Sequence, residues 1–275
     1  MAENQLKFKK KFGQNFLIDE NILKNIIAGA LISEKTGVIE IGPGIGFLTN
    51  HLLRKAQHVL AYEIDPDFVE ILNKEFRHNK NLTIRNIDCL QADINADIKK
   101  YLKDCDEVIV VANIPYNITT PLIFNLLENV PQICRYVLLM QKEVAERICS
   151  GHSTKEYNSL SIAIQYRTVT KKLFNVPRQV FIPRPNVDSA VISLIVKENQ
   201  DKPDNETHFF SLVRNSFRHR RKTLVNNLYI SYNLTKEVGE EILRNLGFNP
   251  LIRSENMTVF DFIRLSNALF AKDIS

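Results

Sequence analysis

Residues 38–46 read Val-Ile-Glu-Ile-Gly-Pro-Gly-Ile-Gly, an apolar run that enters a glycine-rich turn. A helical pattern follows, so Gly42, Gly44 and Gly46 stand where a strand ends and a helix begins. Glycines at such a junction let a ligand approach backbone N–H groups at the helix N-terminus. The stretch therefore predicts a nucleotide-type cofactor site at the end of a buried strand.

The spacing of these glycines separates two cofactor classes. A dinucleotide fingerprint, G-x-G-x-x-G, needs its third glycine at position 47, which is Phe47. The pattern E-x-G-x-G-x-G that begins at Glu40 instead resembles the first motif of class I methyltransferases, whose cofactor S-adenosylmethionine has no pyrophosphate. A nicotinamide oxidoreductase remains an outside alternative, because it would use Glu63 on a ribose in the same way.

Two acids end the strands that follow. Glu63 closes the second strand, 21 residues after Gly42, and Asp88 follows the third. An ionised carboxylate only accepts hydrogen bonds and has room for two donors, so Glu63 can hold both ribose hydroxyls. Asp88 can accept from the adenine amino group of the cofactor. We expect Gly42, Gly44, Glu63 and Asp88 to bind S-adenosylmethionine.

Short apolar runs alternate with helical patterns from Gly37 to Met140. The predicted strands are 38–41, 58–63, 82–85, 107–113 and 135–140, and the predicted helices between them are 50–55, 65–77 and 119–128. Continuous apolar strands separated by helices imply a parallel sheet that is covered on both faces. Stretches 165–176 and 187–197 predict an antiparallel extension. The fold class is therefore α/β, with a mainly parallel, doubly wound sheet of the Rossmann-like methyltransferase type.

A polar, proline-containing stretch at 199–206 predicts a linker. It separates a catalytic domain at 1–198 from a small all-α domain at 207–275, with predicted helices at 207–229, 235–246 and 258–271. In the first of these helices Phe217 falls on the apolar face. The adjoining face carries a basic stripe that we expect to bind RNA phosphates, made of Arg214, Arg218, Arg221 and Lys222.

Charge and composition narrow the function classes. The net charge is +5, and residues from Thr207 onward hold ten Lys/Arg against six Asp/Glu. A second basic cluster holds Lys7, Lys9, Lys10 and Lys11. Both clusters suggest a polyanionic partner. No apolar run approaches the ~20 residues of a membrane helix, and the four scattered cysteines show no zinc spacing. We expect a cytoplasmic monomer without a metal or membrane partner.

The fourth predicted strand ends in Asn113-Ile114-Pro115-Tyr116. In doubly wound sheets ligands sit at the carboxyl ends of the strands, which places this tetrapeptide beside the transferred methyl group. The Asn113 side-chain oxygen and the Ile114 carbonyl can accept the two N6 hydrogens of an adenine. Pro115 stiffens the loop, and Tyr116 can stack on an extruded base. The string matches the [N/D/S]-P-P-[Y/F] signature of amino methyltransferases, with Ile114 at the second position.

Four further segments resemble one family. They are F-G-Q-N-F-L at 12–17, L-M-Q-K-E-V at 139–144, the stretch from Val176-Pro177 through F-I-P-R-P-N-V-D-S-A-V at 181–191, and S-F, R-R-K-T-L and N-N-L at 216–228. With them the chain resembles the ribosomal RNA adenine N6,N6-dimethyltransferases of the small subunit, the KsgA family, from about residue 10 to residue 269.

The resemblance implies a role for individual residues. Asn15 and Leu17 would line the cofactor pocket, Asn113 would also hold the cofactor, and Phe181 would stack on the other face of the adenine. The family dimethylates two adjacent adenines in the 3′-terminal hairpin of 16S ribosomal RNA within the 30S subunit, late in assembly. Loss of this activity in the family confers kasugamycin resistance.

Two alternatives remain open on the same fold. The large-subunit 23S ribosomal RNA methylases of macrolide resistance share the entrance motif and the catalytic loop, although the V-D-S-A-V stretch and the R-R-K-T-L segment favour the small-subunit family. A non-catalytic ribosome assembly factor is the other, against which the intact Glu63, Asp88, Asn113 and Tyr116 argue.

Overall fold

The computed structural model describes residues 15–198, 201–232 and 234–274. The N-terminal lysine cluster, the first three residues of the entrance motif and positions 199 and 200 of the predicted linker lie outside the described residues. The chain forms two compact units. One holds the residues up to Ala145 together with Lys171–Val196, and the other holds Glu146–Thr170 and the residues from Lys197 onward.

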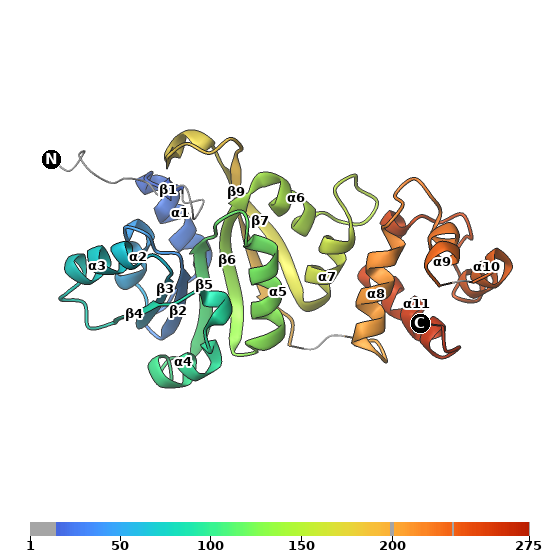
Figure 1. Ribbon diagram of the computed structural model, residues 1–275, viewed down its shortest axis with the longest axis horizontal. Coiled ribbons are helices and arrows are strands. Elements are labelled where there is room, and N and C mark those ends of the chain that lie inside the picture. Colours follow the sequence, from blue (N-terminus) through green and yellow to red (C-terminus); the bar gives the residue numbers. More distant parts are fainter. Residues whose placement is uncertain (1–14, 199–200, 233, 275) are drawn as a thin grey trace. The chain divides into compact units, whose positions relative to one another are not determined.

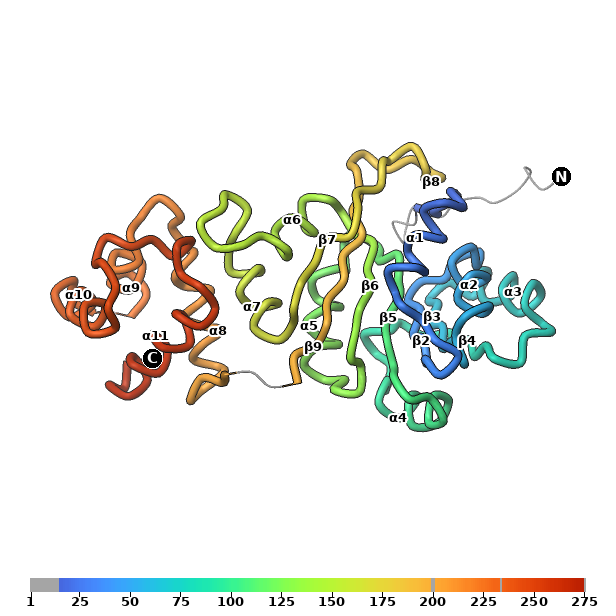
Figure 2. Tube along the Cα trace, turned by 180° about the vertical axis from the view of Figure 1, so that it is seen from behind, coloured from blue at the N-terminus to red at the C-terminus, as the bar shows by residue number. Residues whose placement is uncertain are grey.

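The first unit is built on a seven-stranded sheet in the order β4-β3-β2-β5-β6-β9-β7 (Figures 1 and 2). Its strands are β2 (Thr36–Ile41), β3 (His58–Glu63), β4 (Leu82–Asn86), β5 (Glu107–Asn113), β6 (Ile133–Gln141), β7 (Thr168–Val176) and β9 (Ser189–Val196). Strands β2 to β6 pair in parallel, and β9 is antiparallel to β6. The predicted class, a mainly parallel doubly wound sheet with an antiparallel extension, is confirmed.

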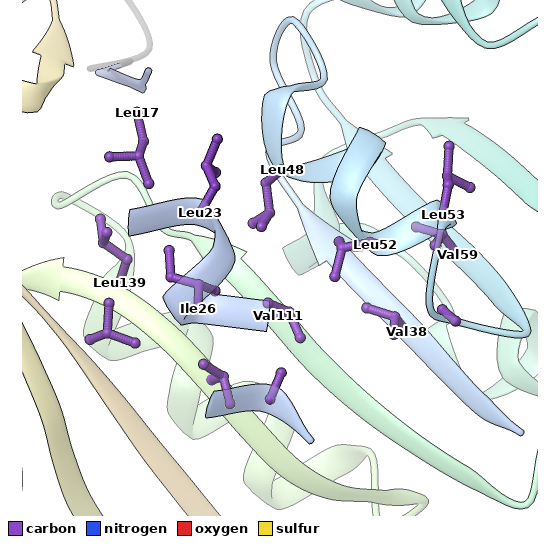
Figure 3. Close-up of a cluster of buried hydrophobic side chains, with 14 of the residues drawn as sticks. Leu17, Leu23, Ile26, Val38, Leu48, Leu52, Leu53, Val59, Val111 and Leu139 are labelled. Atoms are coloured by element: carbon purple, nitrogen blue, oxygen red, sulfur yellow. The ribbon is translucent and has the colours of Figure 1, made fainter. Parts of the chain in front are cut away.

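Helices cover this sheet. They are α1 (Glu20–Ala30), α2 (Phe47–Leu53), α3 (Pro66–Glu75), α4 (Ile94–Tyr101) and α5 (Thr119–Asn129). A single buried cluster joins α1, α2 and α3 to one face of the strands. Figure 3 shows its α1 and α2 side chains beside those of the strands, among them Leu23, Ile26, Leu48, Leu52, Val38 and Val111. Helix α1 was not predicted, although Asp19 caps it by accepting from the N–H groups of Asn21 and Ile22.

A two-stranded ribbon lies outside the main sheet. Strand β1 (Phe16–Leu17) pairs antiparallel with β8 (Phe181–Ile182), so that Leu17 lies opposite Phe181. A short 3₁₀ helix, η3 (Arg178–Val180), precedes β8. The ribbon therefore joins the entrance motif to the proline-rich motif, two segments that are far apart in the sequence.

The second unit is helical. It contains α7 (Ser159–Arg167), α8 (Glu206–Ser216), α9 (Leu224–Tyr232), α10 (Lys236–Asn245), η4 (Ser254–Asn256) and α11 (Val259–Phe270), and α6 (Lys142–Cys149) runs into it from the first unit. Its own core includes Tyr166, Phe209 and Phe262. The sequence-based boundary after residue 198 differs from this division, because Glu146–Thr170 belongs to the helical unit. The assignment of functions to two domains stays a prediction.

The predicted helix at 207–229 is wrong, because two helices occupy this range. Helix α8 ends at Ser216 and α9 begins at Leu224. Four of the five residues at 218–222 are Lys or Arg, and like charges three and four residues apart destabilise a helix. The turn is held instead by Asn227, whose side chain accepts from the His219 N–H at 3.2 Å and donates to the His219 carbonyl at 3.3 Å.

The strand predicted at 165–176 begins three residues too early. Residues 165–167 end helix α7, and β7 starts at Thr168. Asn158 and Ser161 form a capping box at the start of α7. The Gln165 side chain donates to the carbonyls of Ile148 and Ser150 at 2.9 and 2.8 Å, which holds the last turn of the helix in place.

Candidate cofactor and active site

A cavity of about 210 Å³ opens at the carboxyl ends of β2, β3 and β5, where the strand order reverses between β2 and β5. Ligands bind at such reversal points in doubly wound sheets. Ten of the residues predicted from the sequence line this cavity, namely Asn15, Leu17, Gly42, Gly44, Glu63, Asp88, Asn113, Ile114, Pro115 and Tyr116. The structure therefore brings the glycine loop, both strand-end acids and the tetrapeptide to one place.

The glycine loop requires glycine at several positions. Gly42, Gly44 and Gly46 have φ angles of +70°, +58° and +90°, in the left-handed region that side chains disfavour. A Cβ on Gly44 would also lie 2.5 Å from Cε1 of Phe16. The loop thus passes close to the entrance segment and presents its backbone to the cavity.

Glu63 is fixed by backbone donors. Its Oε2 accepts from the Gly44 N–H at 3.0 Å and its Oε1 from the Asp65 N–H at 2.9 Å. The residue is 1% exposed, and burial raises the pKa of its carboxyl while these N–H groups oppose that rise. The Ile64 N–H also stabilises the ionised form. A carboxylate has about four acceptor sites, so Glu63 keeps acceptor capacity for a ligand hydroxyl beside these backbone donors.

Asp88 lies at the start of the 3₁₀ helix η2 (Cys89–Gln91). Its Oδ1 accepts from the Leu90 N–H at 3.0 Å and caps this short helix. The cap fixes the carboxylate at the cavity wall, where its second oxygen can accept from a ligand amino group.

Glu40 adds a third carboxyl to the cavity lining. It is 1% exposed, and its Oε2 has no hydrogen-bond partner among the described residues. Burial raises the pKa of this carboxyl to about 8, the Thr49 hydroxyl opposes the rise, and the nearby Glu63 adds to it. A buried acceptor without a partner beside a cavity suits a ligand that carries a hydrogen-bond donor or a positive charge.

The tetrapeptide is anchored at several atoms. The Asn113 Nδ2 donates to the Asn15 carbonyl at 2.9 Å, which leaves Oδ1 as the acceptor of that side chain. The Ile114 N–H donates to the Leu139 carbonyl at 3.1 Å. Such anchoring gives the Asn113 oxygen one fixed position at the end of β5.

Tyr116 lines the same cavity with its hydroxyl held. The hydroxyl lies 2.7 Å from Oγ of Ser189. Burial raises the pKa of Tyr116 above its ordinary value, so the phenol stays neutral at physiological pH. The residue therefore offers the site an aromatic ring rather than a proton acceptor.

The structure does not bring Phe181 to this cavity. Phe181 is 2% exposed and packs in the core cluster with Leu17 and Val176. Its backbone pairs with Leu17 in the β1–β8 ribbon, and both residues belong to this cluster. The stacking role of Phe181 stays a prediction.

The predicted basic residues belong to the helical unit and do not form a helical stripe. Arg214 lies in the last turn of α8, whereas Arg218, Arg221 and Lys222 lie in the turn between α8 and α9. All four are exposed. These four residues form no stripe because a stripe needs a continuous helix, and the helix breaks after Ser216. Phe217, predicted to be core, is partly buried against the core of this unit.

Several cavity residues were missed from the sequence. Phe16, Phe47, Ile64 and Cys89 line it beside the predicted residues. Ile64 follows Glu63 directly, and it remains 45% exposed although it is a large apolar residue. The sequence signal for Ile64 was its position as an apolar residue directly after Glu63, the polar residue that ends β3.

In the described ranges, no group of three or more His, Cys, Asp or Glu side chains is arranged to hold a metal ion. Nor does any helix in these ranges have the length and apolarity to cross a membrane.

The chain matches one family model and is similar to several named proteins. The family model described as ribosomal RNA adenine dimethylase matches residues 5–269. A protein named ribosomal RNA small subunit methyltransferase A from Bacillus pumilus is 48% identical over 266 residues, which cover 95% of this chain and 91% of the relative. Its namesake from Bacillus mycoides is 46% identical and covers 98% and 93%.

Two solved structures share the fold over nearly the whole chain. A dimethyladenosine transferase from Plasmodium falciparum matches with a TM-score of 0.77 and 29% identity, over 94% of this chain and 98% of that one. The 23S rRNA methyltransferase ErmE matches with a TM-score of 0.72 and 25% identity, over 93% and 100%.

Proposed function

The chain belongs to the ribosomal RNA adenine dimethylase family, and on that premise we propose that it dimethylates N6 of two adjacent adenines in the 3′-terminal hairpin of 16S ribosomal RNA. The family expected from the sequence motifs is confirmed, and the chain is an enzyme of the methyltransferase class. The observation that carries the proposal is that the Asn113–Tyr116 loop shares one cavity with Glu63 and Asp88.

S-adenosylmethionine is the proposed cofactor, and it would supply a methyl group activated by its sulfonium. The residues present fit its polar groups. Glu63 has acceptor capacity for the ribose hydroxyls, Asp88 for the adenine amino group, and the unpartnered Oε2 of Glu40 suits the ammonium of the methionine portion. Asn15, Leu17, Gly42 and Gly44 would complete the walls around it.

The Asn113 loop would orient the target adenine. Adenine N6 is a poor nucleophile, because its lone pair is delocalised into the ring. The Asn113 Oδ1 and the Ile114 carbonyl would accept the N6 hydrogens and favour a pyramidal nitrogen whose lone pair points at the methyl group. Orientation of this kind supplies up to about 7–11 kcal/mol in favourable cases.

Tyr116 would hold the base in the pocket. The target must be unstacked from its neighbours to enter, which costs a few kcal/mol. Stacking on an aromatic ring recovers about 1–3 kcal/mol per base. Because its phenol is neutral, Tyr116 takes part through its ring and removes no proton from the substrate.

The choice of the small subunit rests on the relatives. Those at 46–48% identity are named for the small subunit, whereas the 23S methyltransferase ErmE is 25% identical. We propose that the enzyme acts as a cytoplasmic monomer on the 30S particle, late in its assembly. The large-subunit methylase and the non-catalytic assembly factor are the alternatives that a methyl-transfer assay on both subunits distinguishes.

The exposed basic residues of the helical unit would bind ribosomal RNA phosphates. Replacing Arg221 and Lys222 together by alanine should weaken binding to small subunits. It should also reduce the steepness with which the logarithm of the association constant falls with the logarithm of the salt concentration, by about one to two. Exposed Lys272, near the C-terminal end of the same unit, is the control, and Lys272→Ala should change the slope less. An unchanged slope in the double variant would remove these residues from the RNA interface.

The assay that tests the proposed function supplies labelled S-adenosylmethionine with undermethylated small subunits and, separately, large subunits. We expect label in small-subunit RNA alone. Label only in large-subunit RNA would move the enzyme to the resistance-type methylases. An absence of label together with tight particle binding would support the assembly factor.

A further inference from the structure

The V-D-S stretch at 187–189 has a fixed structure that the proposed function does not yet use. Both the side chain and the backbone of Asp188 are held. Its Oδ1 accepts from the Arg178 N–H at 3.0 Å, and its backbone carbonyl accepts from the Lys142 N–H at 3.0 Å. Ser189 follows as the first residue of β9, fully buried and opposite Gln141 of β6. The Ser189 hydroxyl therefore starts from a rigid backbone.

This hydroxyl meets the tip of Tyr116, a residue 73 positions earlier in the chain. The two oxygens are 2.7 Å apart. The base of the tyrosine is fixed as well, since the Pro115 carbonyl accepts from the Ile118 N–H at 3.1 Å and from the Thr119 hydroxyl at 3.3 Å. Tyr116 is thus held by its loop at one end and by Ser189 at the other.

We propose that Ser189 is a positioning residue for the methyl transfer, and that its hydroxyl fixes the plane of the Tyr116 ring on which the adenine stacks. This inference rests on the proposed function. Ser189 is not among the residues that line the cavity, whereas Tyr116 is, so Ser189 acts through the tyrosine. Without the hydrogen bond the ring can turn about its side-chain torsions, and the base that it supports loses its alignment with the methyl group.

A double-mutant cycle tests the pair. Ser189→Ala and Tyr116→Phe each remove one end of the hydrogen bond and keep the aromatic ring. We expect each to lower kcat on small subunits about three- to tenfold, the size of one neutral hydrogen bond. The double variant should be no slower than the slower single variant. The dissociation constant for S-adenosylmethionine should stay within about twofold throughout, because the cofactor contacts remain.

Ser193 provides a matched control. It lies four residues further along β9, on the same face of the strand, and is 7% exposed. Ser193→Ala removes a buried hydroxyl that has no link to Tyr116, so kcat should match the wild type.

Three results would overturn the inference. They are a wild-type kcat in Ser189→Ala, a wild-type kcat in Tyr116→Phe, and losses that add in the double variant. If the melting temperature of Ser189→Ala lies well below that of Ser193→Ala, the loss of kcat in Ser189→Ala could come from unfolding. The kcat of Tyr116→Phe then decides whether the hydrogen bond matters, because that variant leaves β9 unchanged. A wild-type enzyme that transfers no methyl group would instead refute the proposed function, and the role of Ser189 with it.

Discussion

The side-chain amide of Asn113 donates to the backbone carbonyl of Asn15 over 2.9 Å, and this bond ties the end of β5 to the entrance segment. One interaction thus sets both the orientation of the proposed adenine acceptor and the position of a cavity wall. Its loss should affect catalysis more than folding, because the bond joins the end of β5 to the residue before β1 at the cavity wall.

Asn113→Asp should abolish this arrangement at physiological pH. A carboxylate cannot donate, so the side chain would face the Asn15 carbonyl with an unfavourable charge. We expect kcat to fall about 100-fold or more, because a misplacement of about 1 Å at a reacting centre costs that much. Thermal melting and steady-state methyl transfer measure the two effects separately. Asn129→Ala, an exposed change at the end of α5, is the control. A variant with near-normal kcat would refute the role of Asn113.

Glu63→Gln should weaken cofactor binding. An amide offers one acceptor oxygen in place of two, so it cannot accept from both the Gly44 and the Asp65 N–H and still hold two ribose hydroxyls. We expect the dissociation constant for S-adenosylmethionine to rise about 10- to 100-fold, as two charge-assisted hydrogen bonds weaken. Calorimetric titration measures it, with exposed Glu75→Gln on α3 as the control. Equal affinities for the two variants would exclude Glu63 from the ribose site.

Gly44→Ala should destabilise the protein through two separable effects. The left-handed backbone costs about 1–2 kcal/mol with a side chain, and the close approach of Phe16 adds about 1–3 kcal/mol of overpacking. Gly247 has a φ of +83° with open space around its Cβ position, and Gly151 has open space without that φ. Denaturant unfolding should therefore rank the losses as Gly44→Ala, then Gly247→Ala, then Gly151→Ala near zero. Equal losses at Gly44 and Gly247 would remove Phe16 from the explanation.

Glu40 should make stability depend on pH. Its pKa is about 8 in the folded protein and 4.5 as the ordinary value, so the folded state binds the proton more tightly. Between these values the unfolded state holds fewer protons, and the free energy of unfolding falls as pH rises from about 5 to 8. Glu40→Gln lacks this group, so its unfolding free energy should change less over that range. Denaturation of both proteins from pH 5 to pH 9 gives the difference curve. Parallel curves would show that Glu40 titrates normally.

The site was more predictable than the helical unit because its signals are local. Glu63, Asp88 and Asn113 each end or follow a buried strand, and parallel strands place such ends at one edge of the sheet. The turn between α8 and α9 is held by hydrogen bonds between Asn227 and His219. The helical periodicity of the apolar residues does not reveal such bonds. Helix α1 carries a local signal as well, because Asp19 is a typical N-cap residue directly before it.

Contacts between distant segments were beyond sequence reasoning. Phe181 lies in β8 opposite Leu17, and both side chains belong to one core cluster. The partner of Tyr116 was hidden in the same way, because Ser189 reaches it from another strand. Residue type and spacing located the chemistry, whereas the orientation of these rings needed the tertiary structure.

The most direct test of the account is nucleoside analysis of 16S ribosomal RNA from undermethylated small subunits after incubation with S-adenosylmethionine and either the wild type or Asn113→Ala. The wild type should form two residues of N6,N6-dimethyladenine per RNA, and the variant should form almost none. Dimethyladenine formed equally by both proteins, or a methyl group on any other atom than N6, would contradict the account.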